Sequence, residues 1–445
     1  MRVAAHTLGC KLNYAETSDT LRRLAEQGNE IVSFDAVADL YIVNTCTVTA
    51  VAEKKCRNAI RQAVAQNPDA EVIVMGCMAE ADREAVARIP GVTAVYGNER
   101  KRMLAYSTAG NGADNERTRI FFKIQDGCDY FCTYCAIPLA RGRSRSATVE
   151  ETLCAARKIV SSFQTSVSSD QPTLHSQLST LHSLEIVLTG VNTGTFGQQH
   201  GETLLDLLRG LDAIEGVSRY RISSIEPNLL TDEMIDFIAT SRAFLPHFHI
   251  PLQAGSDKLL RLMHRRYDTA LYRDKLLYIK QCMPDACIAA DVMAGFNGET
   301  EEEFDKVLQY IDSLPISYLH VFTYSDRPGT AALRLGEKIP MQVRREHTAR
   351  LLELSEKKHK AFIDSQLGKT RPVLWESTQV CKSTSQQVNK SAGHDSLTRR
   401  LVDSSTLYMQ GWTDNYIRLC RPYDPVLAGT IEQVEITEQN IVYER

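Results

Sequence analysis

The chain has 445 residues, of which 43% are hydrophobic and 24% are charged, as in an ordinary globular protein of two or more domains. Its 51 Lys and Arg residues nearly balance 55 Asp and Glu residues, so any surface that binds nucleic acid must be local. No apolar run approaches the roughly 18 residues of a membrane span, and no signal peptide is recognisable at the start. We therefore expect a cytoplasmic protein without a membrane segment, whose 12 cysteines lie in a reducing environment.

Short apolar runs alternate with amphipathic stretches in residues 1–108, which we expect to form one domain. The pattern predicts strands at 2–9, 40–46, 71–77 and 92–97, and helices at 13–27, 49–66 and 79–88. Alternation of this kind with short loops is typical of a doubly wound parallel sheet in an α/β protein.

A second strand–helix series follows a polar segment at 109–118 that we interpret as a linker. Its expected strands are 119–126, 185–190, 220–226, 247–252, 287–295 and 317–325. Helices are expected between them, at 148–160, 203–211, 232–239, 256–262, 270–282 and 301–313. Six β/α units in series predict an open, partial β/α barrel, which we assign to residues 117–345.

Two polar segments interrupt these patterns. Residues 161–183 are rich in Ser, Thr and Gln, and we expect a flexible surface insertion that is too polar to pack. Residues 377–405 are also polar and are interpreted as a loop insertion.

The last part of the chain begins with a helical pattern at 341–366, and we assign 346–370 as a connecting helix. Its excess of Lys and Arg fits either a solvated helix face or a surface that contacts RNA. Short strands with Gly and Pro between them then predict a small β-barrel at 371–440.

Three cysteines, Cys128, Cys132 and Cys135, lie in the run CDYFCTYC directly after the strand expected at 119–126. The C-terminal ends of barrel strands form the face on which catalytic sites are built. Three closely spaced thiolates suit an iron–sulfur cluster, and they leave one iron of a cubane open for a substrate or cofactor. Zinc is the alternative, but a structural zinc site takes four ligands and no nearby Cys or His supplies the fourth.

Three further cysteines are distant from one another in sequence, yet each lies at the end of an expected strand. They are Cys10, Cys46 and Cys77. Because the ends of parallel strands meet at one edge of a sheet, we expect these thiols to converge on a second cluster with an open iron. The alternative is three independent buried cysteines, since Cys is often buried.

Other polar or small residues at strand ends are candidates for binding a cofactor: Gly190, Glu226, Gln253 and Asp291. Ordinary strand-end chemistry is an equally good explanation of each. Arg141, Arg143 and Arg145 form a cationic patch, either for phosphates or as a solvated loop.

The cysteine-bearing segments resemble those of the radical S-adenosylmethionine methylthiotransferases. The resemblance rests on AHTLGCKLNYAET (5–17), IVNTCTVT (42–49), VMGCMAE (74–80), GCDYFCTYCAIPLARGRSRS (127–146), IVLTGVNTGTFG (186–197), RISSIEP (221–227), HIPLQAGSDKLLRLMHRRY (249–267) and HVFTYSDRPGTAA (320–332). The opening LGCKLN and RISSIEP look most like the branch that acts on threonylcarbamoyladenosine. The sequence departs from the family pattern at Asn192, Asn297 and the two polar segments.

The resemblance implies an enzyme that adds a methylthio group to C2 of threonylcarbamoyladenosine beside the tRNA anticodon. Two [4Fe-4S] clusters would serve it, with S-adenosylmethionine cleaved at the Cys128, Cys132 and Cys135 cluster and sulfur supplied from the Cys10, Cys46 and Cys77 cluster. The resemblance also implies an RNA-binding TRAM domain at the C-terminus, tRNA as partner, and flavodoxin or ferredoxin as an electron donor. Isopentenyladenosine in tRNA or a ribosomal-protein aspartate is the alternative substrate. A non-catalytic RNA-binding protein and a zinc-stabilised interaction protein are the remaining alternatives.

Overall fold

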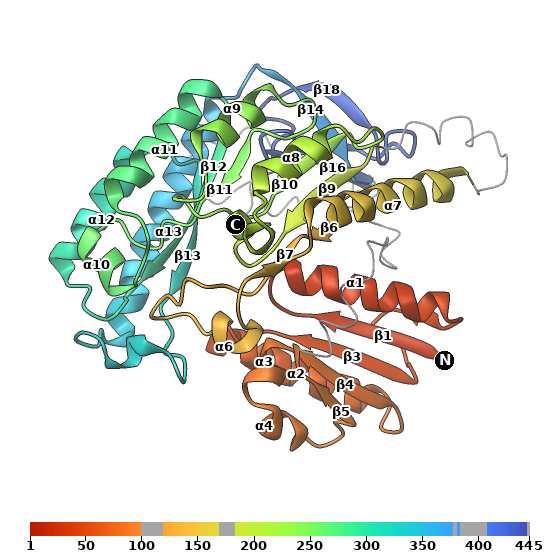
Figure 1. Cartoon of the computed structure of the whole chain (residues 1–445). Helices are drawn as coiled ribbons and strands as arrows, with labels where there is room; N and C mark the ends of the chain where they lie inside the picture. The colour runs from red at the N-terminus through yellow and green to blue at the C-terminus, as the bar shows by residue number, and fades with distance from the viewer. Residues whose placement is uncertain (99–118, 169–182, 377–380, 383–406, 443–445) are drawn as a thin grey trace, which may run out of the picture.

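The computed structural model describes residues 1–98, 119–168, 183–376, 381–382 and 407–442 (Figure 1). The N-terminal part is one parallel sheet in the order β2-β1-β3-β4-β5. Its strands are β1 (Arg2–Thr7), β2 (Glu30–Val32), β3 (Leu40–Thr45), β4 (Glu71–Gly76) and β5 (Ala94–Tyr96). The predicted parallel sheet is confirmed, and the three-residue edge strand β2 was missed because it is too short to show a period.

Helices cover both faces of this sheet: α1 (Lys11–Glu26), α2 (Ala50–Gln66), α3 (Cys77–Ala81) and α4 (Arg83–Ala87). The central strand β3 is buried along its whole length, and its side chains alternate between the two faces. Tyr41 and Val43 join one buried cluster with residues of α2, whereas Leu40 and Ile42 join another beside α1. The sheet is therefore doubly wound, as predicted.

The single helix predicted at 79–88 is divided in two at Asp82. The Asp82 backbone leaves the helical region, and its carboxylate accepts a hydrogen bond from the Ala85 amide at the start of α4. An Asp side chain competes in this way for backbone donors and favours a helix start over a helix interior.

Six parallel strands form the middle of the molecule in their chain order. The first three are β6 (Arg119–Lys123), β9 (Glu185–Thr189) and β10 (Arg219–Ile222), and the next three are β11 (His247–His249), β12 (Cys287–Ala294) and β13 (Tyr318–Thr323). A parallel bridge between Tyr220 and Phe244 joins the two groups. The predicted order of six β/α units in an open barrel agrees with this arrangement. A short hairpin, β7 (Gln125–Asp126) with β8 (Arg145–Ser146), frames the cysteine loop.

Helices lie on the outside of these strands (Figure 1). They are α7 (Val149–Ser168), α8 (Leu204–Asp212), α9 (Asp232–Thr240), α10 (Asp257–Leu262), α11 (Thr269–Cys282), α12 (Glu301–Ser313) and α13 (Met341–Asp364). The flexible insertion expected at 161–183 is corrected in part, because 161–168 continue α7. Ile159, Val160 and Phe163 contact the core and so hold this polar end of the helix. Residues 169–182, like the linker expected at 109–118, lie outside the described residues.

Helix α13 packs against β12, β13 and α12. Its buried side chains recur every three or four residues and include Arg344, His347, Leu351, Ser355 and Lys358. The Arg350 and Lys357 side chains form ion pairs with acidic residues of α12. The helix is therefore part of the wall around the barrel, and it begins five residues before the expected connecting helix.

The C-terminal part is an antiparallel sheet of β14 (Thr370–Trp375), β15 (Cys381–Lys382), β16 (Leu407–Thr413), β17 (Arg418–Pro422) and β18 (Ile431–Glu435). Apart from β15, the insertion expected at 377–405 lies outside the described residues. Arg219 at the start of β10 donates hydrogen bonds to the carbonyls of Trp412 and Pro372. This sheet therefore sits against the N-terminal ends of the barrel strands, opposite the cysteine loop. Among the described residues, no helix has the length and apolar character that crossing a membrane requires.

Candidate active site

The loop that carries Cys128, Cys132 and Cys135 follows hairpin strand β7 at the C-terminal side of β6. The Cys128 amide donates to the Gly142 carbonyl, and the Cys135 amide donates to the Cys132 carbonyl over 3.0 Å. Phe131 adopts a φ of 51°, which allows the chain to turn between the first two cysteines. The three thiols lie close enough that Cys128 and Cys132 both affect the pKa of Cys135. The structure thus brings these three predicted ligands together.

These thiols fit a cationic metal cluster better than they fit a solvent-exposed or protein-paired role. All three are free, and burial, followed by the charge of Cys132, raises the pKa of Cys135 to about 12. A thiolate at such a site needs compensating positive charge, and iron supplies it when a cluster is bound. One protein cation is already present, because the Arg265 guanidinium donates to Cys132 Sγ over 3.2 Å.

Arg265 is a site residue that the sequence analysis did not single out. Its guanidinium also pairs with the predicted residue Glu226, so one side chain connects the cysteine loop to the segment after β10. The available signal was the cationic run at 264–266, but a run of this kind is usually a solvated surface. Only the fold places it beside a sulfur atom.

The other predicted cofactor residues lie on or just after barrel strands. Gly190 follows β9, and a Cβ there would lie 2.9 Å from Gln125 Oε1, so a larger residue would displace the buried Gln125 side chain. Gln253 follows β11 with a φ of 63°, and its amide donates to the Asp291 carbonyl. The Asp291 side chain is deeper in the barrel and pairs with His249.

The two substitutions that depart from the family pattern have different surroundings. The Asn192 amide lies beside Cys128 and favours its thiolate form. Asn297 lies at the end of β12, where its side chain donates a hydrogen bond to the Ala332 carbonyl over 2.8 Å. Asn297 therefore fixes a loop, while Asn192 belongs to the site.

The second group, Cys10, Cys46 and Cys77, lies at the C-terminal ends of the adjacent strands β1, β3 and β4. Burial, together with the charges of Cys77 and Cys10, raises the pKa of Cys46 to about 12. The segment before Cys10 passes so close that a Cβ on Gly9 would lie 3.0 Å from Cys46 Sγ. The structure therefore brings the segments that carry these three cysteines together at one edge of the sheet. This donor set also suits an iron–sulfur cluster.

A buried ion-pair network connects the two cysteine groups. Arg141, in α6 (Ile137–Arg141) just after the first cysteine loop, is 1% exposed and pairs with Glu16 of α1 and Asp126 of β7. It also donates to Asn13 Oδ1 over 2.6 Å. The Asn13 amide in turn donates to the carbonyls of Leu8 and Thr45, in the segments that precede Cys10 and Cys46. The network therefore fixes one cysteine group relative to the other.

The cationic patch expected at Arg141, Arg143 and Arg145 is corrected by this network. Arg141 is buried and Arg145 pairs with Asp126, so neither offers a free charge to a phosphate. Arg143 remains at the surface, with its side chain 76% exposed. The fold satisfies two of the three charges internally, since an unpaired buried guanidinium would be costly.

We expect Arg141→Met to lower the free energy of unfolding by about 1–3 kcal/mol, because buried Glu16 and Asp126 lose one of their two shared cations and keep only Lys123 in common. Urea unfolding of anaerobically purified protein measures this difference. Arg143→Met is the matched control and should change stability by less than about 0.5 kcal/mol, as at an ordinary surface position. Equal losses in the two variants would contradict the role of the network.

Known protein families match both parts of the chain that carry a cysteine group. Residues 2–97 match the family described as uncharacterized protein family UPF0004, and residues 122–311 match the radical SAM superfamily. The threonylcarbamoyladenosine tRNA methylthiotransferase MtaB of Bacillus subtilis (strain 168) is 35% identical over 99% of this chain and 95% of the relative. MtaB of Aquifex aeolicus (strain VF5) is 34% identical over 83% of this chain and 91% of the relative.

A related activity and one solved structure complete the comparison. The tRNA-2-methylthio-N(6)-dimethylallyladenosine synthase of Desulfitobacterium hafniense (strain Y51) is 29% identical over 99% of this chain and 95% of the relative. The radical S-adenosylmethionine methyltransferase TsrM from Kitasatospora setae aligns with a TM-score of 0.49 and 14% identity, over 72% of this chain and 74% of that chain. On the family matches and on relatives that are 34–35% identical over most or nearly all of the chain, this protein belongs to the radical S-adenosylmethionine methylthiotransferase family.

Proposed function

We propose that this enzyme adds a methylthio group to C2 of the adenine of threonylcarbamoyladenosine in tRNA, next to the anticodon. The observation that carries the proposal is the pair of three-cysteine sites, each at the C-terminal ends of parallel strands and both tied to the Arg141 network. The relatives that are named for this activity and match most or nearly all of the chain support the choice of substrate. Isopentenyladenosine in tRNA and a ribosomal-protein aspartate are less supported alternatives.

The six cysteines would form two separate cluster sites. Cys128, Cys132 and Cys135 would hold one [4Fe-4S] cluster, and Cys10, Cys46 and Cys77 would hold the other. When bound, the clusters and S-adenosylmethionine supply the electron, the radical chemistry and the sulfur. Arg265 stabilises the thiolate of Cys132 and positions Glu226 beside the same loop.

Residues around the first cysteine loop are proposed to bind S-adenosylmethionine. Gly190 lies at the end of β9, and Glu226 and Asp291 carry carboxylates suited to the amino or hydroxyl groups of the cofactor. Gln253 adopts a left-handed backbone conformation, and its side-chain amide would contact the cofactor. The base must leave its stack to reach this site, and this costs less in a tRNA loop than in a duplex.

The remaining assignments are part of the same proposal. We also propose a division into residues 1–108, 117–345, 346–370 and 371–440. Separate buried clusters support the first two parts, whereas helix α13 contributes Leu351 to the barrel cluster and Phe362 to the C-terminal cluster. The antiparallel C-terminal sheet would be the small β-barrel of a TRAM domain that binds RNA. A cytoplasmic location and flavodoxin or ferredoxin as electron donor complete the proposal.

Mass spectrometry of tRNA nucleosides tests the proposal. Cells that lack this chain should accumulate threonylcarbamoyladenosine without its 2-methylthio form, and the restored chain should return the product. Loss of the 2-methylthio form of isopentenyladenosine alone would contradict the substrate, and unchanged nucleosides would contradict a tRNA substrate.

A further inference from the structure

The segment that follows β13, residues 325–332, contacts both parts of the chain that carry a cysteine group, and we call it the bridge segment. Its run Arg327-Pro328-Gly329-Thr330 forms a tight turn, in which the Thr330 amide donates to the Arg327 carbonyl over 3.3 Å and Gly329 has a φ of 79°. Proline followed by glycine in the middle of a turn is typical of type II. The Thr330 hydroxyl donates to the same carbonyl over 2.8 Å. The turn therefore fixes the backbone from which the Arg327 side chain extends.

The end of the bridge segment is bound to the first cysteine loop. Ala332 is completely buried, and its amide donates to the carbonyl of Thr133 over 2.7 Å. Thr133 lies between Cys132 and Cys135 in the sequence. The carbonyl of Ala332 accepts the hydrogen bond from Asn297, so the loop after β12 holds the same residue. The bridge segment is therefore attached to the backbone between two of the predicted cluster ligands.

The Arg327 side chain binds the segment that carries a cysteine of the second group. It is 6% exposed and donates to the Thr47 carbonyl over 3.2 Å and to the Glu53 carboxylate over 2.7 Å. Thr47 directly follows Cys46, and its hydroxyl donates to the same Glu53 oxygen over 2.6 Å. Hydrogen bonds from a charged donor are stronger than neutral ones. Arg327 therefore connects the bridge segment firmly to the backbone beside Cys46.

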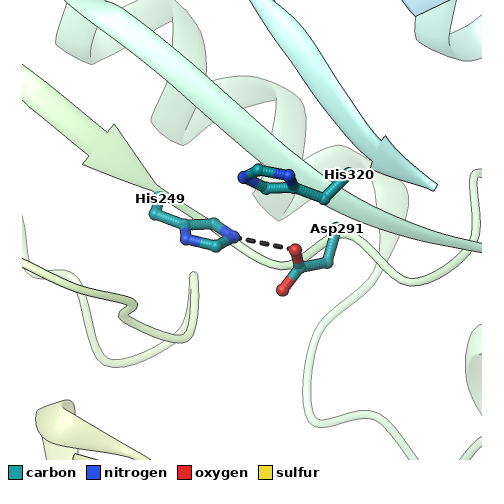
Figure 2. Close-up of side chains that lie close together, drawn as sticks. All are labelled: His249, Asp291 and His320. Carbon is teal, nitrogen blue, oxygen red and sulfur yellow. Dashed lines mark hydrogen bonds and ion pairs between the residues drawn. The ribbon is translucent and has the colours of Figure 1, made fainter. Parts of the chain in front are cut away.

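The contacts of Arg327 differ from those of the polar residues inside the barrel. His249 and Asp291 lie on neighbouring strands and bond to each other, with His320 beside them (Figure 2). Their contact therefore acts within the barrel. Arg327 and Glu53, by contrast, are 274 residues apart in sequence, and Glu53 belongs to a helix of the N-terminal sheet. Their ion pair holds the barrel and the N-terminal sheet relative to each other.

Arg141 and Arg327 contact the N-terminal sheet from opposite faces. Arg141 pairs with Glu16 of α1, whereas Arg327 pairs with Glu53 of α2. Helices α1 and α2 pack into different buried clusters, one on each face of the sheet. One attachment alone would allow the sheet to pivot about it, and a second attachment on the other face restricts this motion. Because a buried guanidinium without acceptors is costly, each arginine resists separation from its partners.

We propose that Arg327 is a positioning residue that fixes the separation and orientation of the two cysteine groups. This inference rests on the proposed function, in which cofactor cleavage at the first group and sulfur transfer from the second act on one base. A misplacement of about 1 Å can lower a rate by about 100-fold, even when its cause is distant from the reacting atoms. Loss of Arg327 therefore uncouples the two steps: cleavage continues, and sulfur transfer fails.

Arg327→Met tests the inference because it removes the guanidinium and keeps an unbranched side chain. The reduced, cluster-loaded variant should form 5′-deoxyadenosine at the wild-type rate, while its yield of methylthiolated tRNA falls by about 100-fold. Its iron and sulfide content should match wild type, since all six cysteines remain. Arg88→Met is the matched control, because Arg88 is an exposed arginine of the N-terminal part that forms a surface ion pair. This control should retain the product.

Pulsed electron paramagnetic resonance on the reduced enzyme measures the distance between the two loaded clusters and requires no RNA. Wild type and Arg88→Met should give one narrow distance distribution, and Arg327→Met a broader or displaced one. Glu53→Met removes the acceptor from the other side and should have the same effect. Because both variants break one contact, the double variant should be no worse than either single variant. Glu53 is partly exposed, so this variant decides the question even where Arg327→Met does not fold.

The outcomes separate the inference from the proposed function. An unchanged distance distribution, or normal product, in Arg327→Met and Glu53→Met would overturn the inference. Parallel loss of 5′-deoxyadenosine, product and iron in a folded variant would assign Arg327 a structural role and would also contradict it. If wild-type enzyme forms no methylthio product on threonylcarbamoyladenosine, the proposed function is wrong, and the distance distributions still decide whether Arg327 positions the two groups.

Discussion

Cys132→Ala is expected to stop the cleavage of S-adenosylmethionine and to leave the Cys10, Cys46 and Cys77 site loaded with iron and sulfide. Cys132 is the central cysteine of its loop, is buried, and accepts a hydrogen bond from Arg265. Losing its thiolate removes one of three cluster ligands and leaves the Arg265 charge without this acceptor. Because losing an outer contact of a metal site already costs about 10- to 100-fold, losing a ligand should reduce cleavage by more than about 100-fold.

The measurement is the yield of 5′-deoxyadenosine from reduced, reconstituted enzyme, together with iron and sulfide content. Cys154→Ala is the matched control, since Cys154 is an exposed cysteine of α7 and is no proposed ligand. This control should cleave the cofactor at the wild-type rate. An undiminished yield from Cys132→Ala would refute the assignment of the cluster to this loop.

Cys46→Ala is expected to have the opposite profile: cofactor cleavage continues, but no methylthio product forms. Cys46 lies at the end of β3, in the N-terminal sheet, and its thiol is buried between the segments that carry Cys10 and Cys77. Its loss should therefore disable the sulfur-donor site without disturbing the loop at Cys132. The assay measures 5′-deoxyadenosine and the methylthiolated nucleoside in the same reaction.

Cys56→Ala is the matched control for Cys46→Ala, because Cys56 lies directly beside Cys46. Its thiol accepts a hydrogen bond from the Cys46 amide over 3.3 Å, and it is completely buried in α2, yet it lies at no strand end. Cys56→Ala makes the same chemical change beside the same site and should retain product formation. Normal product from Cys46→Ala would overturn the donor role, and loss of product from both variants would make Cys56 part of the site.

The order of strands and the location of the six cysteines followed from local patterns. A strand period of two residues is visible in five or more consecutive residues, so the long strands of both parallel sheets were placed correctly, whereas the edge strand at 30–32 was not. Cys10, Cys46 and Cys77 could be grouped because parallel strands end at one edge of a sheet. The segment 161–168 was wrongly expected to be a flexible insertion, because its polar composition does not reveal the apolar contacts that α7 makes there.

The roles of charged residues were decided by contacts between segments distant in sequence. Nothing local distinguishes Arg141, which is buried against Glu16, from Arg143, which is exposed two residues later. Arg265 reaches Cys132 across 133 residues of chain. Sequence by itself determined most of the elements, the family and the candidate cysteine ligands, because periodicity and spacing are local. The partners of buried charges were decided only by the tertiary structure, because burial and pairing depend on which distant segments the fold brings together.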